Sequence, residues 1–242
     1  MRNPRLRVAR LGRAALPALA LLAASIVPAG ADTLVIQPSN QDAFVMKNFP
    51  NRVTGTRNTR LRVEASPAKK IRRALVQFPL GSIPAGSTVG SAVIGLYASV
   101  NAQSSTLTHA LHRVTAPWQE NTVKWNTQPP FAAAPSATAL VGDGRGFKSF
   151  DVTADVQAAI NRCSDDHGWI VKDVAETATD LAVAYISQEE KHPADIGNRP
   201  RLTVAFTPPP CATNADCQDA NLCTTNERCE AGACVVDPVQ CD

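Results

Sequence analysis

The stretch RALVQFPLGSIPAG, residues 73–86, decides the fold class. In its first half the apolar residues Ala74, Val76 and Phe78 occupy every second position, and the polar residues Arg73 and Gln77 lie in the alternate set of positions. A period of two places the apolar side chains on one face of a β-strand. Residues 79–86 are interrupted by proline and glycine, which do not serve a central strand and therefore predict a loop.

The same alternation recurs on both sides of this stretch. It is present at residues 61–63, 94–98 and 202–206, whereas residues 181–186 are apolar throughout and predict a central strand buried on both faces. Thr153 is expected to cap one short helix over 154–161, with Val156 and Ile160 on its buried face. We therefore predict an all-β fold, a two-sheet antiparallel jelly-roll-like β-sandwich with one short helix.

Residues 1–31 have the order of a secretory signal peptide. Five arginines precede an apolar run over residues 14–27, and small residues surround the expected cleavage point after Ala31. An uncleaved anchor helix is the alternative, which Pro17 and Pro28 disfavour. We expect a secreted, extracellular or cell-surface protein with no transmembrane segment after cleavage.

Cysteines mark a second boundary. Six of the seven lie in the last 32 residues, at Cys211, Cys217, Cys223, Cys229, Cys234 and Cys241. So short an exported segment needs cross-links in place of a core, and we predict three disulfides, with fifteen pairings open. The expected domains are a sandwich over 32–206, a proline-rich linker over 207–210 and a cysteine-rich module over 211–242. Cys163 is left over, either as a buried thiol or as an intermolecular bridge.

Charge separates these parts as well. Five of the 24 basic residues lie in the leader, so the rest of the chain carries 19 basic against 21 acidic side chains. This balance and export together disfavour nucleic acid as a partner. Half of the sandwich's basic residues fall between positions 47 and 73, where Glu64 is the one acid.

This basic segment and one aromatic residue form the predicted ligand-binding set. Alternation turns Arg60, Arg62 and Arg73 away from the core, and guanidinium groups bind carboxylates or sulfates with two hydrogen bonds. Solvated charges that protect a sheet edge are the alternative. The candidate ligand-binding residues are Arg60, Arg62, Lys69, Arg72, Arg73 and Tyr97.

Catalysis and metal binding are less well supported by the sequence. The spacing of the acids Glu120, Asp151, Asp155, Glu189 and Glu190 does not define a glycosidase pair, and His109, His112, His167 and His192 lack zinc-site spacing. We predict no catalytic residue and no certain cofactor. Trp118 and Trp125 are expected to be packed loop anchors. A structural Ca²⁺ would suit Asp143 with Asp151, or Asp216 with Asp219 and Asn221.

Several separated motifs resemble one known family. They include the opening stretch, LHRVT at 111–115 with Trp118 and Glu120, VKWNTQP at 123–129, FDVT at 150–153 and RPRLTV at 199–204. Together they resemble the DNRLRE-domain family of bacterial exported proteins, which is similar to carbohydrate-binding module family ninety-six. The motif that names the family is present here only as NTRLRVE at 58–64. The resemblance implies a jelly-roll sandwich that binds acidic polysaccharide.

The C-terminal segment is similar to cysteine-rich repeats of secreted bacterial proteins, through residues 217–225, 227–229 and 232–234. Two functions follow from the sequence. The first is a non-catalytic module that binds polysaccharide, with an acidic glycan as its partner. The alternative is a structural or adhesive extracellular protein that contacts surface proteins through its cysteine-rich tail.

Overall fold

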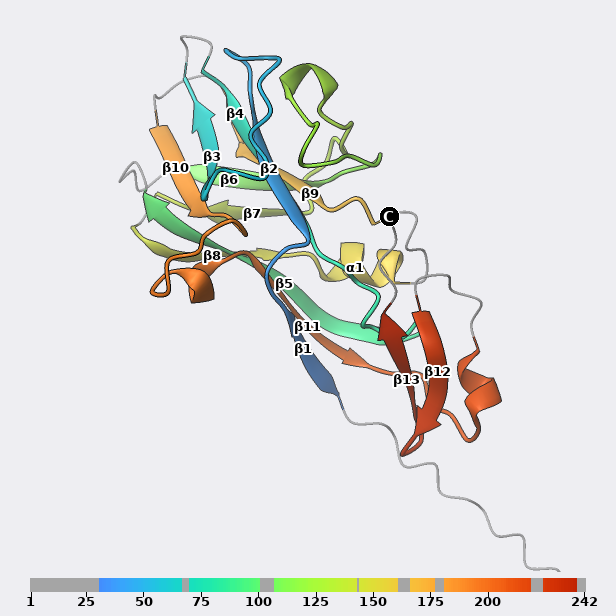
Figure 1. Ribbon diagram of the computed structural model, residues 1–242. Helices are drawn as coiled ribbons and strands as arrows, with labels where there is room; N and C mark the ends of the chain where they lie inside the picture. The colour runs from blue at the N-terminus through green and yellow to red at the C-terminus, as the bar shows by residue number, and fades with distance from the viewer. Residues whose placement is uncertain are drawn as a thin grey trace, which may run out of the picture.

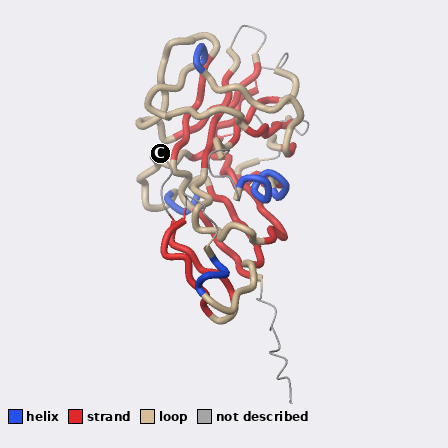
Figure 2. Tube along the Cα trace, turned by 90° about the vertical axis from the view of Figure 1, so that its right-hand side faces the viewer, coloured by secondary structure: helices blue, strands red, loops and turns tan. Residues whose placement is uncertain are grey.

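The computed structural model describes residues 31–66, 70–100, 107–142, 144–160, 166–176, 181–218 and 224–238. Strands dominate these residues and helices are short (Figure 2). The strands are β1 (Asp32–Ile36), β2 (Gln41–Met46), β3 (Arg60–Ala65), β4 (Arg72–Gln77), β5 (Thr88–Val100), β6 (Thr108–Arg113), β7 (Ala137–Leu140), β8 (Gly146–Asp151), β9 (Trp169–Asp173), β10 (Leu181–Ile186), β11 (Arg201–Thr207), β12 (Thr224–Glu230) and β13 (Ala233–Pro238). The helices are α1 (Thr153–Ala159) and the 3₁₀ turns η1 (Trp125–Thr127), η3 (Ile196–Asn198) and η4 (Asn214–Cys217).

Eleven antiparallel strands form the sandwich (Figure 1). One layer contains β1, β11, β5, β8, β10 and β3, and the other contains β2, β4, β9, β6 and β7. The two layers share one hydrogen-bonded path because β3 and β4 pair at Glu64 and Arg72. Two packed layers that meet at this corner confirm the predicted antiparallel sandwich.

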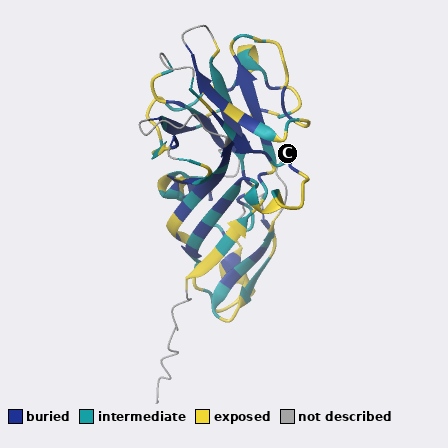
Figure 3. Cartoon of the chain, turned by 90° about the vertical axis from the view of Figure 1, so that its left-hand side faces the viewer, coloured by how far each residue is buried: buried dark blue, intermediate teal, exposed yellow. Residues whose placement is uncertain are grey.

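A single apolar core lies between the layers. It contains Leu61 and Val63 from β3, Ile94 and Leu96 from β5, and the inward residues of the opposite layer. From β4 these are Ala74 and Val76, which are fully buried, as the alternating pattern predicted. Figure 3 shows this alternation as dark blue and teal bands along neighbouring strands of the lower half.

The outer face of the β2–β4–β9 layer is covered by the long segment that follows β6. Leu75 on β4 and Ile170 on β9 pack there against Trp118 and Val123. The Trp118 indole N–H donates to the His167 carbonyl at 2.9 Å, and the side chain is buried. The prediction of Trp118 as a packed anchor is therefore confirmed, and Trp125 is partly buried against the same cluster.

Helix α1 lies beside β5 and buries Val156 and Ile160, as predicted. The predicted cap is wrong, because Thr153 is the first helical residue. The Asp151 carboxylate accepts hydrogen bonds from the Thr153 N–H at 2.9 Å and hydroxyl at 2.7 Å. The Thr153 oxygen in turn accepts the Ala92 N–H at 2.9 Å, so this threonine fastens the helix to β5.

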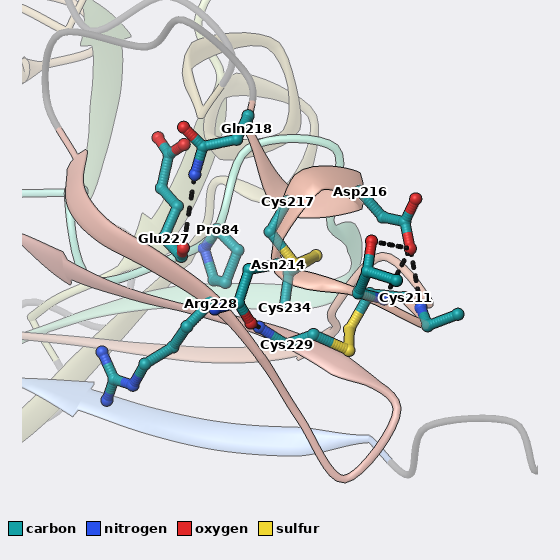
Figure 4. The surroundings of a disulfide bond; sticks show 12 residues. Pro84, Cys211, Asn214, Asp216, Cys217, Gln218, Glu227, Arg228, Cys229 and Cys234 are labelled. Atoms are coloured by element: carbon teal, nitrogen blue, oxygen red, sulfur yellow. Dashed lines mark hydrogen bonds between the residues drawn. A yellow bond between two sulfur atoms is a disulfide. The ribbon is translucent and has the colours of Figure 1, made fainter.

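The C-terminal segment is a two-stranded sheet, β12 and β13, cross-linked to the chain that precedes it. Disulfides join Cys211 to Cys229 and Cys217 to Cys234 (Figure 4). These bonds use four of the six tail cysteines; Cys223 and Cys241 lie outside the described residues, as does Cys163. The two described bonds interleave, so both strands are fastened to one short segment.

Proline residues connect the sandwich directly to this sheet. The Pro209 carbonyl accepts the Cys234 N–H at 3.1 Å, and Pro210 forms a β-bridge with Ala233. In Figure 4, Pro84 from the loop before β5 lies among the residues around a tail disulfide. The end of the linker is therefore hydrogen-bonded to the module that it introduces.

Candidate functional site

Three of the four predicted ligand-binding arginines pair with carboxylates, and Arg60 and Arg72 are the first two. Arg60 forms an ion pair with Glu190 and lies 4.0 Å from Asp195. Arg72 lies 3.0 Å from Glu64, its partner across the corner between the layers. A guanidinium that is already paired has less capacity for an anionic ligand. Arg60 thus fastens β3 to the loop after β10, and Arg72 fastens β4 to β3.

Arg73 lies on the outer face of β4 and is covered by loops. Its guanidinium donates to both carboxylate oxygens of Glu176, at 2.6 and 2.8 Å, and to Gln128 at 2.9 Å. The same group lies 4.8 Å from the ring centroid of Trp125 and 5.4 Å from that of Phe131. Cation–π contacts of this kind anchor the covering loop. Arg73 is therefore separated from Arg60 and Arg62.

Arg62 and Tyr97 remain on an open face. Arg62 is exposed on the outer face of β3 and has no ion pair among the described residues. On the neighbouring strand β10, the small residues Ala182 and Ala184 lie on the same outer side and are not buried. The prediction that residues 181–186 are buried on both faces is therefore wrong for the outer face of β10. Lys69 lies outside the described residues.

Tyr97 belongs to a cluster on the outer face of β5, β8 and β11, which we call the aromatic face. Tyr97 and Phe147 are directly opposite each other, with ring centroids 5.2 Å apart and planes at 82°. The Cζ atom of Arg201 lies 3.8 Å from the Phe147 ring centroid. The aromatic face thus combines two partly exposed rings with a guanidinium that has no ion pair among the described residues.

Gly95 allows this arrangement. It lies opposite Arg201 on β11 and opposite Ser149 on β8, in the middle of the face. A Cβ atom at this position would approach the Arg201 side chain at 3.2 Å and the Phe147 ring at 3.3 Å. Because glycine leaves this space free, the arginine can lie flat across β5 and reach the ring on the next strand.

The sequence interpretation missed Phe147 and Arg201. The alternation of residues 202–206 marks Arg201 as outward, and Phe147 is one residue away from a Lys148 that points inward with Phe150. Neither pattern places residue 147 beside residue 201, because β8 and β11 lie on opposite edges of β5. That contact depends on the strand order.

Three of the candidate acids have structural partners. Asp151 holds the start of α1, and its hydrogen bonds with Thr153 lower its pKa. Asp155 accepts from Ser136 at 2.5 Å and from the Trp169 indole at 2.7 Å. Glu190 accepts two backbone N–H groups besides Arg60, which lowers its pKa. Each of these carboxylates therefore holds neighbouring segments of the fold together.

Glu120 and Glu189 lie in a second group, together with Asp42. The buried Asp42 carboxylate accepts the Gln188 N–H at 2.8 Å and approaches the Ser187 hydroxyl at 2.9 Å. That hydroxyl also lies 2.8 Å from Glu189. One O–H group donates to one carboxylate at a time, so the second carboxylate of this pair requires a proton of its own.

Burial sets the charge of the carboxyl groups here. Desolvation raises the pKa of Asp42 to about 7, with a further contribution from Glu189, although its hydrogen bonds oppose the rise. Burial also raises the pKa of Glu120, whose carboxylate accepts the Asp42 N–H at 3.1 Å and the Gln188 amide at 2.6 Å. The arrangement joins the start of β2 to the segment after β10 and thereby links the two layers.

The histidines do not converge on a common site. His109 is buried with its Nδ1 2.8 Å from the Tyr185 hydroxyl, and His112 Nδ1 lies 2.9 Å from the Ala132 carbonyl. Desolvation lowers the pKa of His109 to about 3. Within the described ranges, one group of sulfur atoms is close enough for a metal, but these atoms belong to the two tail disulfides.

The predicted calcium ligands either have other partners or lie outside the described residues. Asp216 accepts the backbone N–H groups of Ala212 and Thr213 at 2.9 and 2.7 Å, as a cap of η4. Asp151 is engaged with α1, and Asp143, Asp219 and Asn221 lie outside the described residues. The calcium expectation thus stays a prediction.

The described helices contain none long and apolar enough to cross a membrane. An antiparallel sandwich that presents aromatic rings and a guanidinium on an open sheet face has the features of a carbohydrate-binding module. The chain belongs to carbohydrate-binding module family 96, whose family model matches residues 34–204. No curated protein matches the sequence significantly.

Proposed function

We propose that this protein binds acidic polysaccharide through the aromatic face. The observation that carries the proposal is the Arg201 guanidinium, which stacks on Phe147 beside Tyr97 and has no carboxylate partner among the described residues. Sugar rings present C–H groups that pack on aromatic side chains, and a uronate carboxylate or a sulfate accepts two hydrogen bonds from a guanidinium. Family membership supplies the general class of ligand.

Arg62 extends the face toward the corner of the sandwich. It lies on the same outer side as Tyr97, with β10 between its strand and β5. Neighbouring strands are about 4.8 Å apart, so a chain of several sugar residues can cross from β11 to β3. Ala182 and Ala184 on β10 have small side chains, so the surface between Tyr97 and Arg62 stays low enough for a sugar chain to cross.

Retention of the protein on native gels that contain alginate or polygalacturonate, with cellulose as a neutral control, tests the proposal. We expect Tyr97→Ala and Arg201→Ser each to weaken binding about tenfold, corresponding to about 1.4 kcal/mol, and 0.5 M salt to weaken it further. Gly95→Val should have a similar effect because it displaces Arg201 without removing a binding group.

Lys70→Ser is the matched control, since it removes one exposed positive charge outside the aromatic face. Its retention should equal that of the wild type. Unchanged retention of the Tyr97 and Arg201 variants, with folding verified by circular dichroism, would reject the aromatic face as the binding site.

We also propose that the protein is exported and acts without catalysis. The two tail disulfides support export, because such bonds persist in oxidising compartments. The structural partners of Asp151, Asp155 and Glu190 support a binding role. N-terminal sequencing of the secreted protein should begin at Asp32, and incubation with alginate or polygalacturonate should release no new reducing ends.

A further inference from the structure

A second candidate site lies on the other side of the sandwich, in the segment that follows β6. Seven residues between Pro117 and Thr127 line an open hollow of about 530 Å³, with Trp118 in its wall and the polar groups of Gln119, Thr122, Lys124 and Thr127 around it. Small-molecule sites have volumes of roughly 300–1,000 Å³ and combine an apolar wall with a few polar groups. The hollow therefore has the volume of a site for one or a few sugar residues, with polar groups at its rim.

One basic residue, Lys124, lines this hollow, and two more lie on a loop that contacts the lining segment. Lys124 has no ion pair among the described residues, and the neighbouring loop over 47–59 carries the exposed Arg52 and Arg57. That loop is fastened to the lining segment, because the Pro50 carbonyl accepts the Asn126 N–H at 3.2 Å. Its Gly55 packs so closely on the Glu120 backbone that a Cβ atom there would overlap the carbonyl oxygen.

The one acid within residues 117–127 is engaged elsewhere. Glu120 follows Gln119 in the chain, but its carboxylate accepts the Asp42 N–H and the Gln188 side-chain amide. Burial raises its pKa, so its negative charge is weakened at acidic pH. The cations at Arg52, Arg57 and Lys124 thus remain available for an anionic ligand.

The hollow and the aromatic face lie on opposite sides of the protein. Trp118 and Val123 pack on the outer face of β2, β4 and β9, whereas Tyr97 and Arg201 lie on the outer face of β5 and β11. The apolar core lies between these layers. Packed sheets are about 10 Å apart, so ligands on the two outer faces are separated by roughly 20 Å of protein.

We infer that the hollow is a second site for an acidic glycan, so that one molecule binds two chains and cross-links them. The inference rests on the proposed function of the aromatic face, and it adds the second site and the cross-linking. Two sites on opposite faces favour two separate chains over one continuous chain.

Isothermal titration of the full chain with an alginate tetrasaccharide, in calcium-free buffer, counts the sites. The face variant combines Tyr97→Ala with Arg201→Ser, and the hollow variant combines Arg52→Ser, Arg57→Ser and Lys124→Ala. We expect two ligands per wild-type chain and one for each variant. Light scattering of long-chain alginate should rise at least fivefold with the wild type and remain at baseline with either variant, while each variant is still retained on alginate gels.

The outcomes separate the two proposals. If the wild-type chain binds one ligand and only the face variant abolishes this binding, the second site is overturned and the proposed function stands. One ligand that only the hollow variant abolishes would overturn the aromatic face as a site and, with it, cross-linking. A hollow variant that still binds two ligands and scatters light like the wild type would overturn the inference directly. Sedimentation velocity excludes dimers as the source of scattering.

Discussion

Replacement of Asp42 by asparagine tests how burial controls the stability of the sandwich. Burial raises the pKa of this carboxyl group from 3.8 to about 7. Between these values the folded protein keeps a proton that the unfolded chain releases, so this group's contribution to stability falls as pH rises. A pKa difference of this size corresponds to about 4 kcal/mol, lost between about pH 4 and pH 7.

Asp42→Asn removes this titration and keeps both the shape of the side chain and an acceptor for the Gln188 N–H. The difference in free energy of unfolding between variant and wild type should therefore move in favour of the variant by about 4 kcal/mol from pH 4 to pH 8. The difference is the quantity to compare, because other groups titrate in both proteins. One is His109, whose lowered pKa makes stability fall as pH drops below about 6.5.

Urea unfolding, followed by tryptophan fluorescence at five pH values from 4 to 8, measures this difference. Asp151→Asn is the matched control: hydrogen bonds lower the pKa of Asp151, so its charge already contributes fully above about pH 4, and the variant-minus-wild-type difference should stay nearly constant over this range. This prediction is refuted if the difference between Asp42→Asn and wild type is constant across this range, or if it moves in favour of the wild type as pH rises. Asp42 would then not be a buried, protonated carboxyl group at the junction of the layers.

Three further changes have expected outcomes. Tyr185→Phe removes the hydroxyl beside Nδ1 of the buried His109, and should lower the free energy of unfolding by about 1–3 kcal/mol in the same urea assay at pH 7. Gly168→Ala should destabilise by at least about 3 kcal/mol, seen as a lower unfolding midpoint, because φ is +70° and a Cβ would overlap the backbone of β4. Removal of the Cys217–Cys234 bond by a double alanine change should expose the tail to trypsin without altering the sandwich's thermal transition, since a closed loop of this length contributes about 3 kcal/mol.

For each of these three changes, a specific result would contradict the prediction. Gly197→Ala has open space around its added Cβ and should leave the midpoint unchanged, so equal effects at the two glycines would refute the steric argument. A tail that resists trypsin equally with and without its disulfide would show that contacts with the sandwich hold it in place. A Tyr185→Phe protein as stable as the wild type would show that His109 needs no partner there.

Alternation in the sequence was enough to predict β3, β4, β5 and β11 and the side of each that faces the core. Val76 and Ile94 are buried because a strand turns every second side chain to the same face, which is a local property of the backbone. The short helix and the cysteine-rich tail were also visible, because a four-residue apolar spacing and a concentration of cysteines are local signals.

Whether an outward charge is available to a ligand depends on the tertiary structure. Arg73 and Arg62 look equivalent in the alternation, yet loops bring Glu176 and Trp125 to Arg73, while Arg62 remains open. Residues distant in the chain supply these partners, and no local pattern encodes them.

The sequence by itself therefore determined the all-β class, the buried face of β3, β4, β5 and β11, and the family to which residues 34–204 belong. Strand order alone decided that β8 and β11 lie on either side of β5, which places Phe147, Gly95 and Arg201 together. The physical reason is that the period of two is written into consecutive residues, whereas the pairing of strands is set by packing and hydrogen bonds between segments far apart in the chain.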